Sequence, residues 1–296
     1  KAGVGAVVLK SIFEEQINEE TSGVFKAGYG MGDAYPEAED YIKAYIRSNT
    51  IQKYVELVRN AKSRLTIPVI ASVNCFSGGE WVSFARQLEE AGADALELNV
   101  FILPVNEFKE SVEVENVYFE IVKSIKSQIK IPVSVKISHY FTNLSAFVDK
   151  IKAYGANATT LFNRFYEPDI NINTLEMGAA SVFSTAAELR TTLRWTGILA
   201  GKDKRLEISA STGVHGGEAA VKLLLAGATT VQVCSVLYEK GIHVIEDINN
   251  FFGKWMDSKA FKTIEDYRGM LSYSSIENPD LYERAQFMKY FSNKQY

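Results

Sequence analysis

Polar side chains that could take part in chemistry recur where the apolar, strand-length runs of this sequence end. The set includes two lysines and three asparagines, and carboxylates are nearly absent from it. Amides and ammonium groups are costly to bury unless a ligand or a hydrogen-bond network satisfies them. The set therefore indicates a site for a polar, electron-rich, anionic ligand. Its members are Lys10, Ser11, Ser72, Asn74, Asn99, Lys136, Ser138, Asn163, Arg164, Ser211, Thr212, Cys234 and Ser235.

A simpler interpretation exists for single members of this set. Ser72 or Ser138 alone is explained as a cap of the following helix, whereas Lys10 and Lys136 together favour a ligand. Metal-assisted hydrolysis is disfavoured, because it needs clustered carboxylates or histidines and the three histidines show no ligand spacing. Glycosidase chemistry needs two facing carboxylates, and Glu97 stands alone in its strand. Ser-His-Asp chemistry lacks a nucleophile elbow.

A phosphate site is predicted near the end of the chain. The segment ISASTGVHGGEAA, residues 208 to 220, ends a strand in small residues and opens a helix. Small residues let backbone N–H groups approach a phosphate, and a helix N-terminus adds favourable partial charge. A tight turn without a ligand is the alternative. The predicted phosphate residues are Ser211, Thr212, Gly213, Cys234 and Ser235.

The elements that must position these residues alternate between strands and helices. Runs that are apolar on both faces are separated by helix-length segments, which is typical of a parallel sheet covered by helices. With one further strand expected before residue 1, the count reaches the eight strands of a (β/α)8 TIM barrel, so the N-terminal strand is expected to be absent from this chain. An open doubly wound sheet is the alternative. The seven predicted strands are 5–11, 67–74, 94–100, 131–138, 158–163, 205–212 and 229–235.

Short motifs mark where these strands begin. An AG or YG pair precedes four of them, and glycine suits a left-handed helix cap. Ile-Pro-Val opens two others, because proline is tolerated at the first residue of a strand. The long loop from Thr21 to Asp40 is expected to form part of a lid. Residues 241 to 296 are expected to form the last barrel helix and a C-terminal helical cap.

Composition narrows the classes of partner. The net charge is −4 and the basic residues are spread along the chain, so we expect a small-molecule substrate and no nucleic acid. Two cysteines are too few for a disulfide framework and suit a reducing, cytoplasmic location. No apolar run is long enough to span a membrane. We predict one domain over residues 1 to 296, with a homodimer left open.

Several of these motifs, in order along the chain, resemble the dihydroorotate dehydrogenase family. They include AGVGAVVLKS, GADALELN, PVSVKIS, LFNRFYEPDI, STGVHGGEAA and LLAGATTVQVCSVLYEKG. The resemblance implies an FMN-containing barrel that oxidises dihydroorotate to orotate in pyrimidine biosynthesis. It implies that Asn99 and Asn163 also face the substrate. The flavin-contacting positions implied by the match are Lys10, Ser11, Asn99, Lys136, Asn163, Thr212, Gly213, Cys234 and Ser235.

The chain departs from the family pattern where the catalytic base is expected. The family carries Ser-Cys-Pro-Asn after the ELN motif, and an ungapped match places Ile102 at the base, which cannot take a proton. Arg164 follows Asn163 where a small hydroxyl is usual, and a second substrate-binding asparagine motif is not recognisable. The pattern is similar to a divergent subgroup that keeps the FMN site. Two weak candidates for a replacement acid or base are His139 and Cys75.

Three functional hypotheses follow. The first is an FMN-dependent oxidoreductase acting on dihydroorotate or a related small CH–CH compound by hydride transfer to the flavin. The second is a flavin-binding homologue without dehydrogenase activity, serving as a regulatory or partner protein, which Ile102 motivates. The third is a barrel that binds a phosphorylated metabolite and no flavin. The natural substrate and the electron acceptor are not encoded in any motif of the chain.

Overall fold

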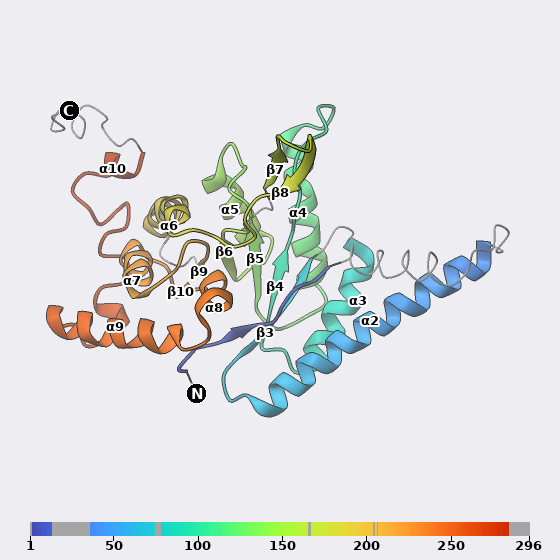
Figure 1. Ribbon diagram of the computed structural model, residues 1–296, viewed down its shortest axis with the longest axis horizontal. Helices are drawn as coiled ribbons and strands as arrows, with labels where there is room; N and C mark the ends of the chain where they lie inside the picture. The colour runs from blue at the N-terminus through green and yellow to red at the C-terminus, as the bar shows by residue number, and fades with distance from the viewer. Residues whose placement is uncertain are drawn as a thin grey trace. The chain divides into compact units, whose positions relative to one another are not determined.

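The computed structural model describes residues 2–13, 36–74, 78–164, 167–203, 205 and 207–283. Two compact units make up the chain. We call residues 4–137 with 146–157 the first unit, and residues 1–3, 138–145 and 158–296 the second unit. Each unit is described by itself below, and Figure 1 labels the elements of both.

The first unit contains a sheet of parallel strands. Strand β3 (Val69–Asn74) pairs with β1 (Val7–Val8) and β2 (Ile12–Phe13) on one side and with β4 (Ala95–Asn99) on the other, and β4 pairs with β5 (Val133–Ile137). All of these pairings are parallel. Strands β3 and β4 are almost wholly buried, as expected for a parallel sheet covered by helices.

Helices α2 (Pro36–Arg64), α3 (Gly78–Glu90), α4 (Ser111–Lys126) and the part of α5 (Leu144–Ala153) that follows Ser145 complete the first unit. Helix α2 contacts β3 and α3, and α3 contacts α4 (Figure 1). The Glu110 backbone N–H donates 2.8 Å to the Glu113 carboxylate and so satisfies a donor at the start of α4. The buried face of α4 packs against α5, where the rings of Tyr118 and Phe147 meet edge to face at 5.2 Å.

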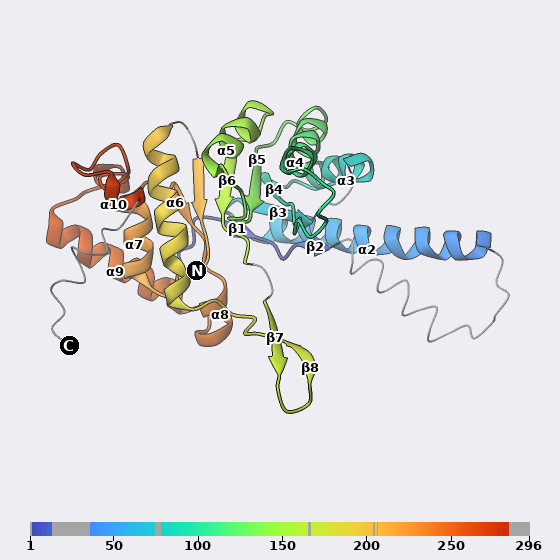
Figure 2. The same cartoon turned by 90° about the horizontal axis from the view of Figure 1, so that it is seen from above.

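The second unit contains its own parallel strands and a hairpin. Strand β9 (Glu207–Ala210) pairs in parallel with β6 (Ala158–Leu161) and with β10 (Thr230–Val231). Strands β7 (Pro168–Asn171) and β8 (Glu176–Ala179) form an antiparallel hairpin. Figure 2 shows this hairpin extending away from β6, β9 and the helices of its own unit. Its residues are exposed along both strands.

Helices cover the strands of the second unit. They are η1 (Ala186–Glu188), α6 (Leu189–Lys202), α7 (Gly217–Ala226), α8 (Ser235–Lys240), α9 (Val244–Lys259), η2 (Ile264–Asp266) and α10 (Asp280–Glu283). Helix α7 contacts α6, α9 and β10. One apolar core fixes these contacts, because it joins Ala210 of β9 to Leu189 of α6, Leu223 of α7, Val236 of α8 and Ile248 of α9.

Each of the seven predicted strands contains an observed strand, and the start motifs behave as predicted. Gly92, Gly155 and Gly227 have φ of +96°, +110° and +115°, the left-handed conformation that glycine adopts without strain. Val69 and Val133, each directly after a proline, begin β3 and β5. The observed strands are shorter than predicted; for example, the run 5–11 yields only Val7–Val8.

Two features of the fold were not predicted. Strand β2 follows the predicted first strand and pairs with the end of β3. The β7–β8 hairpin lies in a segment that was assigned no strand, although Ile170-Asn171-Ile172-Asn173 alternates apolar and polar residues as a half-exposed strand does. The predicted lid from Thr21 to Asp40 lies largely outside the described residues.

Candidate functional site

The carboxyl ends of β3, β4 and β5 place three polar side chains in one row of the first unit. Asn74 pairs in register with Asn99, and Asn99 pairs in register with Lys136. Residues paired in parallel strands point to the same face of the sheet, and neighbouring strands lie about 4.8 Å apart. Asn74 and Asn99 are only 2% and 6% exposed, whereas the Lys136 side chain is 20% exposed. The row therefore opens toward solvent at its cationic end.

A second polar layer lies two residues earlier in the same strands. Glu97 is buried, and its Oε1 lies 3.5 Å from Nζ of Lys136. Glu97 stands alone as a carboxylate in its strand, but in the structure it is the counter-ion of Lys136. In the low dielectric of a buried site this pairing keeps the ammonium in place and offsets part of its charge.

Ser72 anchors the same layer. Its hydroxyl lies 2.6 Å from the hydroxyl of Ser11, so the predicted flavin-contacting Ser11 is held against β3. The Tyr54 hydroxyl donates 2.8 Å to the Ser72 carbonyl and accepts from the Ser72 N–H at 2.9 Å. Burial raises the pKa of Tyr54 to about 12, so this phenol stays protonated and keeps donating. Lys10, the neighbour of Ser11, is exposed in the first unit.

The predicted phosphate segment of the second unit turns sharply after β9. Thr212 and Gly213 both have positive φ, +78° and +79°. The Thr212 hydroxyl donates 3.0 Å to the Phe162 carbonyl after β6, and the Thr192 hydroxyl of α6 donates 2.8 Å to the Ser211 carbonyl. Both hydrogen bonds run from a threonine hydroxyl to a backbone carbonyl. Together they hold the backbone of Ser211, Thr212 and Gly213 in one conformation.

Two further predicted phosphate residues lie at the start of α8: Cys234 directly precedes the helix, and Ser235 is its first residue. The Ser235 hydroxyl accepts from the Ser184 N–H at 3.0 Å and from the Ser184 hydroxyl at 3.1 Å. The Ser184 hydroxyl also lies 3.2 Å from Nε2 of His215, whose Nδ1 lies 3.6 Å from the Glu239 carboxylate. Ser235 is thus tied into a polar network of the second unit, while Cys234 is exposed and free.

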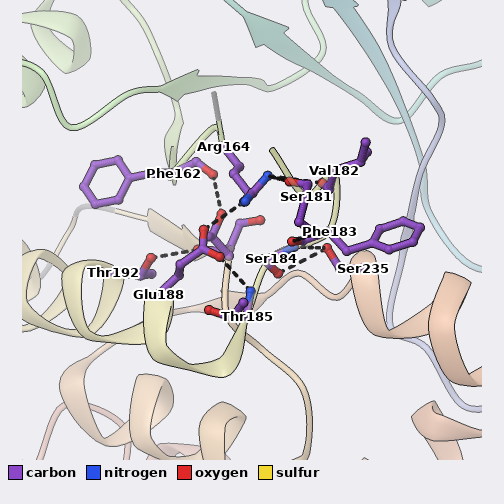
Figure 3. A network of polar contacts seen from close by, with 12 residues as sticks. Phe162, Arg164, Ser181, Val182, Phe183, Ser184, Thr185, Glu188, Thr192 and Ser235 are labelled. Atoms are coloured by element: carbon purple, nitrogen blue, oxygen red, sulfur yellow. Dashed lines mark hydrogen bonds and ion pairs between the residues drawn. The ribbon is translucent and has the colours of Figure 1, made fainter. Parts of the chain in front are cut away.

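Arg164, which follows the predicted ligand residue Asn163, is part of a separate ion pair. Its Nε donates 2.8 Å to Glu188, and its Nη1 donates 2.8 Å to the Ser181 carbonyl. Figure 3 shows the guanidinium pointing toward both partners, with Ser184 beside Ser235. Burial would raise the pKa of Glu188, but hydrogen bonds from Thr185 and Arg164 outweigh it and lower the pKa below its usual range. Arg164 therefore holds both ends of residues 181–188 through its hydrogen bonds to Ser181 and Glu188.

Residues 46–256 match the family model described as dihydroorotate dehydrogenase. The chain belongs to the dihydroorotate dehydrogenase family. It is 30% identical over 274 residues to the dihydroorotate dehydrogenase B (NAD(+)) catalytic subunit of Thermoplasma acidophilum, with 90% of this chain and 87% of that protein covered.

A second relative agrees with the family, and a solved structure shows the fold. A putative dihydroorotate dehydrogenase A (fumarate) of Aeropyrum pernix is 28% identical over 267 residues, which cover 82% of this chain and 81% of that protein. A crystal structure of a dihydroorotate dehydrogenase from Eimeria tenella, in complex with ferulenol, matches with a TM-score of 0.59 at 15% identity and covers 74% of this chain and 67% of that chain. The fold is therefore an α/β fold of the TIM-barrel kind, as predicted from the sequence.

Membership of this oxidoreductase family raises the question of whether the observed residues fit FMN. The row on β3 to β5 offers one cation, Lys136, and two carboxamides, and a flavin ring presents both acceptor and donor atoms. The Asn74 Oδ1 is buried and has no hydrogen-bond partner among the residues that the structure describes. A buried acceptor in this state fits a site whose ligand supplies the missing donor. The donor set fits FMN.

The loop after β4 carries the departure from the family pattern. Ile102 and Phe101 are half-buried, and Leu103 is 52% exposed. The backbone of Ile102 hydrogen-bonds the hydroxyl of Tyr118, a buried residue of α4 whose pKa burial raises to about 12. This contact ties Ile102 to α4, and its aliphatic side chain stands at the position where the ungapped match predicts the base.

Of the two weak candidates for a replacement base, His139 is described by the structure and Cys75 is not. His139 lies beside the Tyr140 ring, with centroids 4.3 Å apart, and meets the Phe162 ring edge to face at 5.8 Å. Partial burial lowers the pKa of His139, against an opposing effect of Glu167, which favours the neutral imidazole. A neutral imidazole is the form that accepts a proton. Cys75 lies outside the described residues.

Several residues of the site were not singled out for these roles by sequence reasoning. Glu97 as a counter-ion and Ser184 as the partner of Ser235 depend on contacts between distant segments, so no local motif signals them. The His215–Glu239 contact is of the same kind.

Across the described ranges no three His, Cys, Asp or Glu residues gather into a metal-binding group. In the same ranges no helix is both long enough and apolar enough to cross a membrane.

Proposed function

We propose that this chain binds FMN and works as an oxidoreductase of the dihydroorotate dehydrogenase type, oxidising dihydroorotate or a related small CH–CH compound. The observation that carries the proposal is the row on β3 to β5, in which Lys136 is held by buried Glu97 beside Asn99 and Asn74. The family membership of the chain supports the choice of FMN as the ligand.

The chain's own residues have separable roles in this proposal. FMN, when bound, supplies the two-electron oxidation, by accepting a hydride from the substrate. Lys136 and Asn99 would contact the flavin, with Lys136 placing positive charge beside the ring system that gains negative charge on reduction. Glu97 orients Lys136, and the Ser11–Ser72 contact fixes the start of the β1-to-α2 segment against β3.

Further ligand contacts that the family resemblance implies are proposed for residues of the second unit. We propose that Ser211, Thr212, Gly213, Cys234 and Ser235 hold the phosphate group. Bonds to Phe162 and Thr192 fix the turn at residues 211–213, and a bond from Ser184 holds Ser235. Asn163 is proposed as a residue that contacts both flavin and substrate, as is Asn99. Lys10 is proposed as a further flavin contact. We also retain, as proposals, one domain over residues 1–296, a small-molecule substrate and a cytoplasmic location.

The visible absorption spectrum of the purified protein tests the cofactor, and anaerobic mixing with dihydroorotate tests the substrate. We expect a yellow protein whose flavin absorbance bleaches on mixing and returns with oxygen. A colourless protein that also fails to take up added FMN would remove the flavin. Intact, chemically reducible flavin that dihydroorotate leaves oxidised would remove dihydroorotate as the substrate.

Ile102 favours a second candidate function, a flavin-binding homologue without dehydrogenase activity that acts as a regulatory or partner protein. Isoleucine cannot remove a proton from a substrate carbon, and its backbone is tied to Tyr118. A panel of reduced pyrimidines under anaerobic conditions separates the two candidates. Reduction of the bound flavin by any member at a rate useful for turnover excludes the second one.

A further inference from the structure

Asn74 closes the polar row at its buried end. It is the last residue of β3, pairs in register with Asn99 of β4, and lies two strands from Lys136 of β5. It is 2% exposed, less than either of the other two. No motif of the sequence analysis assigned a role to this residue beyond membership of the polar strand ends.

The Asn74 carboxamide oxygen lacks a hydrogen-bond donor in the described part of the chain. Its Oδ1 is buried and accepts no hydrogen bond from any described residue. Ser72, the neighbouring polar residue on the same face, is already engaged through its hydroxyl with Ser11 and through its backbone with Tyr54. A buried acceptor without a donor destabilises the ligand-free protein, and a ligand that supplies a donor removes this cost.

We propose that Asn74 is a specificity-determining residue whose Oδ1 accepts a hydrogen bond from the ring N–H of a cyclic imide, the edge –C(=O)–NH–C(=O)–. This inference rests on the proposed function and deepens it. The row offers a carboxamide acceptor at Asn74 and a positive charge at Lys136, and an imide edge offers an N–H donor flanked by carbonyl acceptors. A site built to pair an N–H rejects analogues that lack it, because its own acceptor is then left unpaired.

Two ligands carry this imide edge: the pyrimidine portion of the flavin, and a pyrimidine substrate or product. Binding measurements distinguish them.

The test variant is Asn74→Leu, which keeps a similar side-chain volume and removes the acceptor. The control is Thr196→Val, because the Thr196 hydroxyl on α6 is likewise buried and without a partner in the described ranges. Both variants should leave the Tm of ligand-free protein unchanged or raise it, since each removes an unpaired polar atom.

The variants should differ in ligand affinity. Asn74→Leu should weaken binding of one ligand at least tenfold, about 1.4 kcal/mol, while Thr196→Val leaves both affinities at the wild-type value. One arm measures FMN binding to apoprotein by flavin fluorescence quenching, and the other measures orotate binding to FMN-loaded protein by the perturbation of flavin absorbance. N-methylation of the imide should weaken binding of the same ligand to wild type and have no further effect on Asn74→Leu.

The outcomes separate this inference from the proposed function. If wild type and Thr196→Val bind FMN and Asn74→Leu loses neither FMN nor orotate affinity, the role of Asn74 is refuted and the proposed function stands. A lower Tm of ligand-free Asn74→Leu, with both affinities retained, also refutes it, because Asn74 then has a structural partner. If wild type binds no FMN, the proposed function fails and the inference falls with it.

Discussion

Nζ of Lys136 on β5 lies 3.5 Å from Oε1 of Glu97 on β4, and Glu97 is almost fully buried. Removing one partner of such a pair leaves an uncompensated charge, which costs about 3–5 kcal/mol. Lys136→Met should therefore lower the free energy of unfolding by that amount. The double variant with Glu97→Gln should recover most of the loss, which urea unfolding of the four proteins measures. Losses that simply add would contradict the pairing.

The Lys136–Glu97 pair should also affect the bound cofactor. Lys136→Ala should weaken FMN binding or lower the reduction potential of bound FMN, because positive charge near the reduced ring is lost. Glu97→Gln should shift the potential in the opposite direction, since it removes the counter-charge of Lys136. Potentials from dye equilibration check both signs. Unchanged flavin content and potential in Lys136→Ala would refute its place beside the flavin.

Ile102 is the position at which a base can be restored. Ile102→Cys should create or raise dihydroorotate oxidation, because a cysteine thiolate takes the proton that isoleucine cannot. Ile102→Ala is the control, since it shortens the side chain to a similar degree without supplying a base. Anaerobic flavin reduction by dihydroorotate measures the rate. Equal rates in the two variants would show that side-chain size, and not a base, limits the reaction.

Gly213 is predicted to tolerate no side chain. Its φ is +79°, and an added Cβ would lie 2.3 Å from the backbone nitrogen of Leu189. Gly213→Ala should cost about 2–5 kcal/mol from left-handed strain and overpacking. Gly216→Ala is the matched control in the same segment, because φ there is extended and nothing lies within 4 Å of the added atom. It should stay within about 1 kcal/mol of wild type.

Glu188 should contribute stability that depends on pH. Burial opposes its ionisation, but the Thr185 N–H and the Arg164 guanidinium hold its pKa below the ordinary 4.5. A lowered pKa stabilises the folded state above the ordinary pKa, and this contribution is lost as pH falls through the folded-state value. Glu188→Gln should thus cost about 1.5–3 kcal/mol at pH 7 and progressively less in acid.

Urea unfolding between pH 7 and pH 3 measures this dependence. Glu120→Gln, on an exposed position of α4, is the control and should show no comparable loss at either pH. A loss in Glu188→Gln that stays constant down to pH 3 would contradict an ionic role for this carboxylate.

Local patterns in the sequence were sufficient to predict seven of the strands and the motifs at which they begin. The alternation of apolar runs with helical segments predicted the parallel α/β class, and the AG and YG pairs predicted left-handed caps that Gly92 and Gly227 adopt. These features depend on backbone stereochemistry and on burial of both sheet faces, which a short stretch of chain specifies. The β7–β8 hairpin was missed because its residues are exposed and gave no apolar run.

The sequence by itself determined which residues stand at the strand ends, among them Asn99, Lys136 and Ser235, and it indicated the family. That Ile102 replaces the family's base stays a prediction. Only the tertiary structure decided what these residues touch. Strand register puts Glu97 beside Lys136 and leaves the Asn74 acceptor without a described partner, and a return of the chain brings Ser184 to Ser235. The Ser184–Ser235 contact joins residues 51 positions apart. These contacts arise from register and packing, which no local pattern encodes.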